Sequence, residues 1–170
     1  MPATPLLNLG YMSGTMHATT QFNTDYHSML LQSKGLLDGE TDFIANLANL
    51  SAIIWMNMPA INWCGFYIKK QQQLVLGPFQ GKPACIRIEM GKGVCGTAAA
   101  KASTQIVDDV HQFPGHIACD SASNSEIVLP ILQNGDVIAV LDIDSPLLQR
   151  FNQQDGLELQ KVVNVLQQTL

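Results

Sequence analysis

The sequence predicts a single α+β domain, because the spacing of apolar residues changes twice along its 170 residues. Helical spacing comes first and ends at Pro59, and alternation typical of strands then runs from Asn62 to Asp144 before helical spacing returns. Most of the strands are joined by hairpins, which favours an antiparallel central sheet. We expect the N- and C-terminal helices to cover one face of this sheet, and a ligand pocket to lie on the other.

Two helices are expected before the sheet. The first spans about residues 26–35, and the second spans about residues 42–58, since Pro59 cannot continue a helix. Residues 1–22 contain no sustained period, and we interpret them as a flexible N-terminal arm or a cloning remnant. The domain itself is therefore assigned to residues 23–170.

Alternating segments and two further helices complete the domain. Asn134-Gly135 joins the last two strands and is the strongest short hairpin signal in the chain. A short alanine-rich helix is expected at about residues 94–102, and Asn152 caps a final helix. The buried face of that helix carries Leu159, Val162, Val163, Leu166 and Leu170. The expected strands are residues 63–69, 74–79, 84–90, 104–107, 126–132 and 137–144.

The composition limits the possible partners. The net charge is −5 and no cluster of Lys and Arg occurs, which excludes nucleic acid as a partner. No apolar run approaches the roughly 20 residues that span a bilayer, and no basic residue precedes Lys34, so neither a membrane segment nor a secretory signal is expected. We therefore expect a cytoplasmic protein whose four cysteines are free or form transient catalytic disulfides.

The stretch from Asp108 to Pro130 has the composition of a reactive loop. It places two histidines, a cysteine and several carboxylates between two apolar strands. Loops held by a rigid scaffold are where catalytic residues concentrate. Cys119 has polar neighbours, and His116 three residues earlier would favour its thiolate. We therefore expect Cys119 to act as a nucleophile.

Alternation along the strands assigns side chains to the two faces of the sheet. Ile86 and Ile88 belong to the apolar set of their strand, so Cys85 is expected on the opposite face, outside the core. Trp63 and Tyr67 share one face with a glycine between them, which would form a notch. Aromatic residues are also usual in a core, so this pair alone does not establish a pocket.

Three carboxylates are expected at one edge of the sheet. Asp142 and Asp144 share a face of the last strand, and Glu126 begins the strand before it. Aspartate is depleted in strands, so two of them beside a buried run need a partner or a ligand, unless they cap the following turn. Packed together and partly desolvated, at least one would have a raised pKa and could donate a proton near neutral pH.

Several alternatives stay open at this point. Cys64 fits a packing thiol, and Cys95, near a helix start, is either activated by the helix dipole or packed against that helix. A zinc site using Cys85, Cys95, Cys119 and a histidine would lack any Cys-x-x-Cys pair, so no resident metal is expected. Residues 91–96 lack the Gly-Lys-Ser/Thr ending of a phosphate loop. A Cys-His hydrolase is compatible with the residue types alone.

Eight short blocks of this sequence together resemble the free methionine-(R)-sulfoxide reductases, which are built on the GAF fold. The blocks occur in order between about Thr41 and Leu166, and several contain a cysteine, which makes the resemblance specific. They are residues 62–67, 76–81, 84–88, 91–96, 109–111, 116–119, 125–128 and 140–145.

The resemblance implies an oxidoreductase that acts on free L-methionine-(R)-sulfoxide and not on a sulfoxide within a protein chain. Cys119 would attack the sulfoxide sulfur, releasing methionine and leaving a sulfenic acid, which Cys85 would resolve as a disulfide. Cys95 matches a further family cysteine that would serve as an alternate resolving thiol. Thioredoxin would reduce the disulfide as an external reductant, and no bound cofactor is implied.

The resemblance also assigns roles in the pocket. Glu126, Asp142 and Asp144 match the family's pocket carboxylates, and would protonate the sulfoxide oxygen or hold the substrate ammonium. Trp63 and Tyr67 would form an apolar wall for the S-methyl group.

Two features depart from the family pattern, and one other function stays open. Cys64 stands where a small apolar residue is expected, and residues 1–22 have no counterpart. Family members are often homodimers, and the sequence leaves both a monomer and a homodimer open for this chain.

The alternative function is a GAF-type sensor module that binds a small ligand without converting it. Such modules are normally joined to an output domain, for which no residues remain here, and this favours the enzyme.

Overall fold

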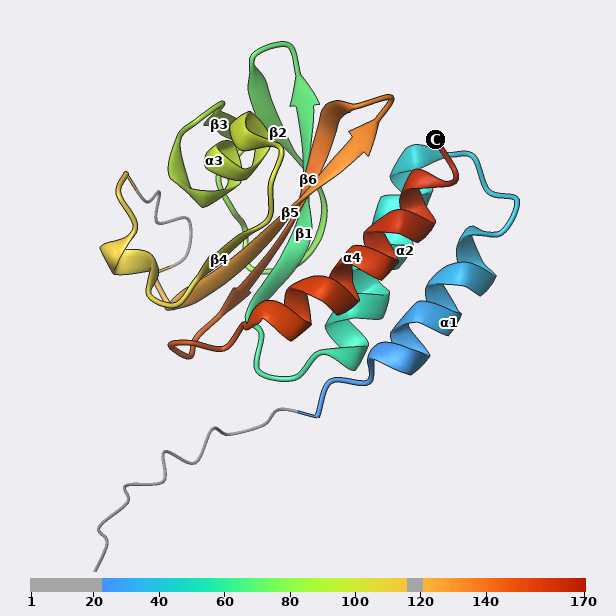
Figure 1. The fold of residues 1–170 in the computed structure, drawn as a ribbon, viewed down its shortest axis with the longest axis horizontal. Helices are drawn as coiled ribbons and strands as arrows, with labels where there is room; N and C mark the ends of the chain where they lie inside the picture. Colours follow the sequence, from blue (N-terminus) through green and yellow to red (C-terminus); the bar gives the residue numbers. More distant parts are fainter. Residues whose placement is uncertain (1–22, 116–120) are drawn as a thin grey trace, which may run out of the picture.

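The computed structural model, which describes residues 23–115 and 121–170, contains a curled antiparallel sheet with helices on both faces (Figure 1). The short helix α3 (Gly93–Lys101) lies over one face of the sheet. The opposite face is covered by α2 (Phe43–Asn57) and α4 (Gln153–Gln167), and α1 (Tyr26–Leu37) packs against these two helices. The predicted α+β class, with the N- and C-terminal helices together on one face, is confirmed.

The sheet has six strands within the described ranges, in the order β3-β2-β1-β6-β5-β4. Each pair of neighbours is antiparallel. The hairpin between β5 and β6 turns at Asn134 and Gly135, with φ of 54° and 88°, as predicted for this dipeptide. The strands are β1 (Trp63–Lys70), β2 (Gln73–Gly81), β3 (Arg87–Glu89), β4 (Gln105–Val107), β5 (Ser125–Gln133) and β6 (Asp136–Ser145), and a 3-10 turn η1 (Val110–Gln112) follows β4.

Side-chain caps fix the starts of α1 and α2. Asp25 and Asp42 each accept a hydrogen bond from the backbone N–H three residues later, at 2.9 and 2.8 Å. Helix α1 continues to Leu37, beyond the predicted end at Gly35, because a glycine is tolerated within a helix at a cost of only about 1 kcal/mol. Helix α2 ends directly before the Met58-Pro59 pair, as predicted.

A buried polar cluster joins α1 to the start of α4. Asn152 caps α4 in a capping box with Asp155. The hydroxyl of Tyr26 donates to Asp155, and the guanidinium of Arg150 lies 3.6 Å from the same carboxylate. Arg150 also donates to the carbonyl of Pro59, which follows α2. The cluster therefore ties together the ends of all three helices on this face of the sheet.

An apolar core fills the space between these helices and the sheet. It includes Cys64 and Phe66 from β1 and Ile143 from β6, each fully buried. Cys64 therefore packs in the core, as predicted. Leu170 was expected on the buried face of the last helix, but it lies beyond the end of α4 and is 38% exposed. The other expected core residues of α4, namely Leu159, Val162, Val163 and Leu166, are buried.

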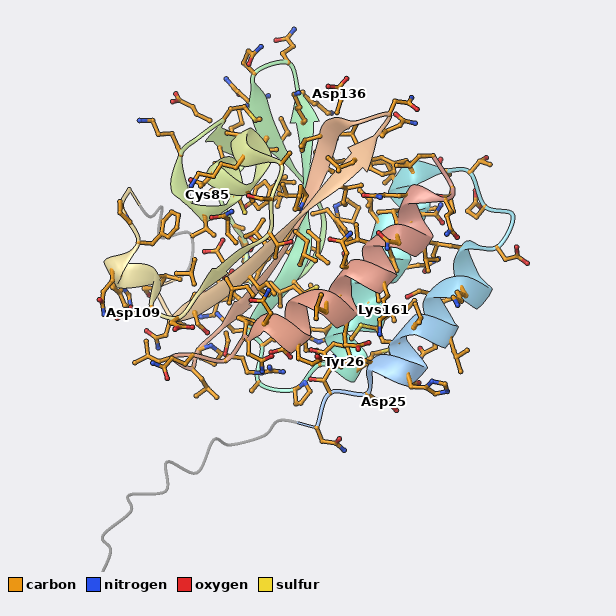
Figure 2. All side chains as sticks on the ribbon, viewed as in Figure 1. Asp25, Tyr26, Cys85, Asp109, Asp136 and Lys161 are labelled. Atoms are coloured by element: carbon orange, nitrogen blue, oxygen red, sulfur yellow. The ribbon has the colours of Figure 1, made fainter. Side chains whose placement is uncertain are left out.

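The segment before α3 differs from the prediction. A strand was expected over residues 84–90, but β3 covers only Arg87–Glu89. Alternation therefore fails for the residues before it: Ile86 is 69% exposed, whereas Cys85 is half-buried and packs on the same side as Ile88. Cys85 does lie outside the helix-side core, on the α3 side of the molecule (Figure 2), but loop geometry and not strand alternation places it there.

Candidate active site

A small cavity lies between α3 and the sheet, on the face opposite the three long helices. It measures about 40 Å³, several times the space that one water molecule requires. Strands β1, β5 and β6 form its floor, and the N-terminal turn of α3 and the segment before β3 form its walls. The five residues predicted to bind the substrate all line it: Trp63, Tyr67, Glu126, Asp142 and Asp144.

Stacked aromatic rings form one wall of the cavity. The ring centroids of Trp63 and Tyr67 lie 5.8 Å apart with an interplanar angle of 26°, and Phe79 also stacks on Trp63, at 5.3 Å and 15°. The indole N–H donates to the carbonyl of Lys82 at 3.0 Å, which fixes the ring in its plane. A Cβ at Gly65 would overlap the Cβ of Phe79 and lie 2.8 Å from the indole, so only glycine permits this stack.

Two carboxylates and one thiol form the polar part of the cavity lining. Glu126 and Asp142 are each 6% exposed, and Cys95 at the start of α3 is 4% exposed. The thiol of Cys95 lies 3.8 Å from Oε1 of Glu126, and one ligand atom from each of the three side chains lies within 4.8 Å of the other two. Asp144 is paired with Glu126 in the register of β5 and β6, and it also lines the cavity.

The same enclosure raises the pKa values of these groups. Desolvation is the main cause for Glu126, whose pKa lies well above its usual range, and the nearby Asp142 and Asp144 raise it further. Desolvation also raises the pKa of Asp142 to about 6. Among the described residues that line the cavity, only Lys92 is basic, and its side chain is exposed. The cavity therefore combines buried acids with little opposing charge from the described residues, and this raises the affinity of both acids for protons.

The described cysteines lie in different environments. Cys64 and Cys95 carry free thiols, whereas Cys85 is disulfide-bonded. Burial raises the pKa of the Cys95 thiol, and Asp142 and Glu126 raise it further. The helix dipole therefore does not activate Cys95, which was one of the two alternatives for it. The predicted nucleophile Cys119 and the neighbouring His116 lie outside the described residues.

The structure adds cavity residues that the sequence reasoning missed. Lys92, Gly93 and Val94 bring the N-terminal end of α3 to the cavity, where the first N–H groups of a helix have no intrahelical partners. The Gly-Lys-Gly motif at this point was noted, but it was weighed only against a phosphate loop. Phe79, which is not itself a lining residue but stacks on Trp63, was also missed, although its place opposite Gly65 in the β1–β2 hairpin could have indicated it.

The fold and the site define a GAF domain: a curled antiparallel sheet with long helices on one face and a small enclosed cavity on the other. The family model of the GAF domain matches residues 43–170, and the chain belongs to this family. Within it, the chain belongs to the free methionine-R-sulfoxide reductases.

Three relatives carry this second assignment. The free methionine-R-sulfoxide reductase of Escherichia coli is 53% identical over 135 residues, which are 79% of this chain and 82% of the relative. The structure of fRMsr of Staphylococcus aureus in complex with substrate has a TM-score of 0.84 at 48% identity, over 89% of this chain and 99% of that chain. The free methionine-R-sulfoxide reductase from Neisseria meningitidis in complex with its substrate has a TM-score of 0.82 at 44% identity, over 85% and 87%.

Proposed function

We propose that this protein reduces free L-methionine-(R)-sulfoxide to L-methionine, with Cys119 as the nucleophile and Cys85 as the resolving thiol. The observation that carries the proposal is the cavity itself. It pairs an aromatic wall with buried acids that hold protons, in a chain that is 53% identical to the free methionine-R-sulfoxide reductase of Escherichia coli.

The cavity offers a separate position for each group of a free amino acid sulfoxide. Asp142 and Asp144 attract the α-ammonium group, and the N-terminal end of α3 with Lys92 attracts the α-carboxylate. Trp63 and Tyr67 pack against the S-methyl group. A methionine sulfoxide within a protein chain has neither terminal charge, so this arrangement selects the free amino acid.

Glu126 is suited to protonate the sulfoxide oxygen, because burial and the nearby aspartates raise its pKa and so favour the protonated acid. The sulfur of Cys119 attacks the sulfoxide sulfur, and the S–O bond then breaks. The protonated oxygen is transferred from the methionine sulfur to the Cys119 sulfur, so methionine leaves and Cys119 becomes a sulfenic acid. The thiol of Cys85 then attacks this sulfenic acid, forming a disulfide and releasing water. Thioredoxin supplies two thiols that reduce the disulfide and becomes oxidised itself.

The states of the described cysteines support Cys85 as the resolving residue. Cys85 is disulfide-bonded, while Cys64 and Cys95 are free. Cys95 is also buried, and its raised pKa disfavours the thiolate that would attack the sulfenic acid. Cys95 stays the alternative resolving thiol. No metal or bound cofactor enters this scheme.

A cytoplasmic location is part of the proposal, since thioredoxin keeps thiols reduced there. Among the residues described, no helix is long and apolar enough to cross a membrane.

A homodimer is the proposed assembly, because α2 contains no charged residue and exposes Ile44, Trp55 and Met56. A second copy of this uncharged face would cover these side chains, and light scattering coupled to gel filtration measures the resulting mass.

The central experiment follows NADPH consumption with thioredoxin, thioredoxin reductase and each sulfoxide epimer. We expect turnover of the free R epimer alone, abolished by Cys119→Ser and retained by Cys64→Ala. Binding of the R epimer without turnover would instead identify a sensor module. Peptide mapping after one turnover without reductant should find Cys119 linked to Cys85, and a link to Cys95 would reassign the resolving step.

A further inference from the structure

Three side chains from separate elements converge in the cavity as one compact set of metal ligands. Cys95 comes from the first turn of α3, Glu126 from β5 and Asp142 from β6. Each is at least nine-tenths buried, and one ligand atom from each lies within 4.8 Å of the other two. The three residues are 31 and 16 positions apart along the chain, so only the fold brings them together.

Their spacing suits a tetrahedral cation. With metal–sulfur and metal–oxygen bonds of about 2.3 and 2.1 Å, neighbouring ligand atoms in a tetrahedral zinc site lie about 3.5 Å apart. The observed distance from Sγ of Cys95 to Oε1 of Glu126 is 3.8 Å. Small rotations of the two carboxylate side chains would bring the set to bonding distance.

A second observation points to a cation at this position. Oδ1 of Asp142 is buried and has no hydrogen-bond partner among the described residues. An unpaired buried carboxylate oxygen is costly, and among the described residues that line the cavity only the exposed Lys92 is basic. A bound cation would supply the missing partner for this oxygen.

We propose that the cavity reversibly binds one Zn²⁺ ion through Cys95, Glu126 and Asp142, and that bound zinc excludes the substrate. The thiolate ligand selects a borderline-soft cation over Mg²⁺ or Ca²⁺, which prefer more ligands and oxygen alone. When the metal binds, the Cys95 thiol and the Glu126 carboxyl group each release a proton to solvent. Water occupies the fourth position, and the carboxylates that bind zinc are no longer available to the sulfoxide. The ion is thus an inhibitor and not a cofactor.

This inference goes beyond the proposed function, and its test does not depend on turnover. Co²⁺ serves as the probe, because it takes zinc sites and gives a thiolate-to-metal charge-transfer band in the near ultraviolet. The titration uses the enzyme with the Cys85 disulfide formed and without added thiols, so that this residue cannot contribute a ligand. We expect one Co²⁺ per chain, displaced by Zn²⁺ and prevented by excess L-methionine.

Matched variants assign the site. Cys95→Ser should abolish the charge-transfer band and weaken binding at least about tenfold, since even indirect partners of a metal ligand contribute 10- to 100-fold. Cys64→Ala removes the other free thiol of the described residues, which is fully buried on the opposite face of the sheet, and should leave the band unchanged. Glu126→Gln should retain the band but weaken binding, which tests the site independently if Cys95→Ser fails to fold.

Two outcomes would overturn the proposal. One is the absence of a charge-transfer band in the wild-type protein at millimolar Co²⁺, and the other is a band that survives in folded Cys95→Ser. Inhibition of turnover is measured separately: zinc should raise KM for the sulfoxide without lowering kcat. If the protein binds Co²⁺ as expected but has no reductase activity, the metal site stands and the proposed function fails.

Discussion

Replacing Asp142 by asparagine should change how the stability of the protein depends on pH. Burial raises the pKa of Asp142 from 3.8 to about 6, so the folded state binds this proton more tightly than the unfolded state. Between these two values the folded protein retains the proton while the unfolded chain releases it. The contribution of Asp142 to stability is therefore greatest below pH 3.8 and is lost as the pH rises toward 6.

The size of this effect follows from the two pKa values. A pKa shift from 3.8 to about 6 lowers the free energy of unfolding by about 3 kcal/mol when the pH rises from well below 3.8 to well above 6. Between pH 4.5 and pH 8 the loss is about 2 kcal/mol. Asp142 also raises the pKa of Glu126, so removing its charge flattens the pH dependence further. When the pH is raised from 4.5 to 8, the free energy of unfolding of the Asp142→Asn variant should therefore increase by at least about 2 kcal/mol relative to that of wild type.

Urea unfolding of the variant and of wild type at pH 4.5 and at pH 8 measures this change. The relevant quantity is the difference in unfolding free energy between the two proteins, compared between the two pH values. The comparison cancels any constant cost of the new amide in the cavity, because that cost is the same at each pH. Asp136→Asn is the matched control, since it removes an exposed carboxylate from the start of the same strand (Figure 2). If Asp142→Asn and wild type show the same pH dependence, Asp142 is not held protonated by burial and our account of the cavity is wrong.

Two further predictions concern the aromatic wall and the helical layer. Phe79→Leu removes the ring that stacks on Trp63, an aromatic contact worth about 0.5–1.5 kcal/mol. The variant should raise KM for the sulfoxide about 2- to 12-fold, with a smaller change in kcat. A change confined to kcat would contradict this positioning role. Arg150→Ala leaves Asp155 buried without its cation and should cost about 3–5 kcal/mol of unfolding free energy, whereas Lys161→Ala breaks an exposed pair on α4 and should cost less than about 1 kcal/mol. Urea denaturation distinguishes the two, and equal costs would refute the assigned difference between buried and exposed pairs.

The fold was largely predictable because its signals are local. Caps and breakers such as Asp42 and Pro59 fix the ends of α2, and Asn134-Gly135 fixes the last hairpin. The segment at Cys85 was predicted poorly because its local signal was misleading. Apolar residues alternate there, but the chain forms a loop that leaves Ile86 exposed, and only tertiary contacts decide between these outcomes.

The site was predictable where a single strand carries it. Alternation correctly placed Trp63 and Tyr67 on one face of β1, and Asp142 on the cavity face of β6. What the sequence alone could not provide was proximity between elements. Cys95 was considered as a helix-start thiol, but its contact with Glu126 depends on how α3 lies over the sheet.

The two faces of the sheet therefore differ in what they contribute. On the helix side, apolar packing and the buried Arg150–Asp155 cluster stabilise the fold. On the α3 side, the chain buries Glu126 and Asp142 together, and their raised pKa values make the folded state less stable at neutral pH than at a pH where both are protonated. Such a cost persists in a protein when the groups serve a function. A cation in the cavity, whether the ammonium group of a substrate or a metal ion, removes that cost by pairing with the acids, so binding and stability should rise together there.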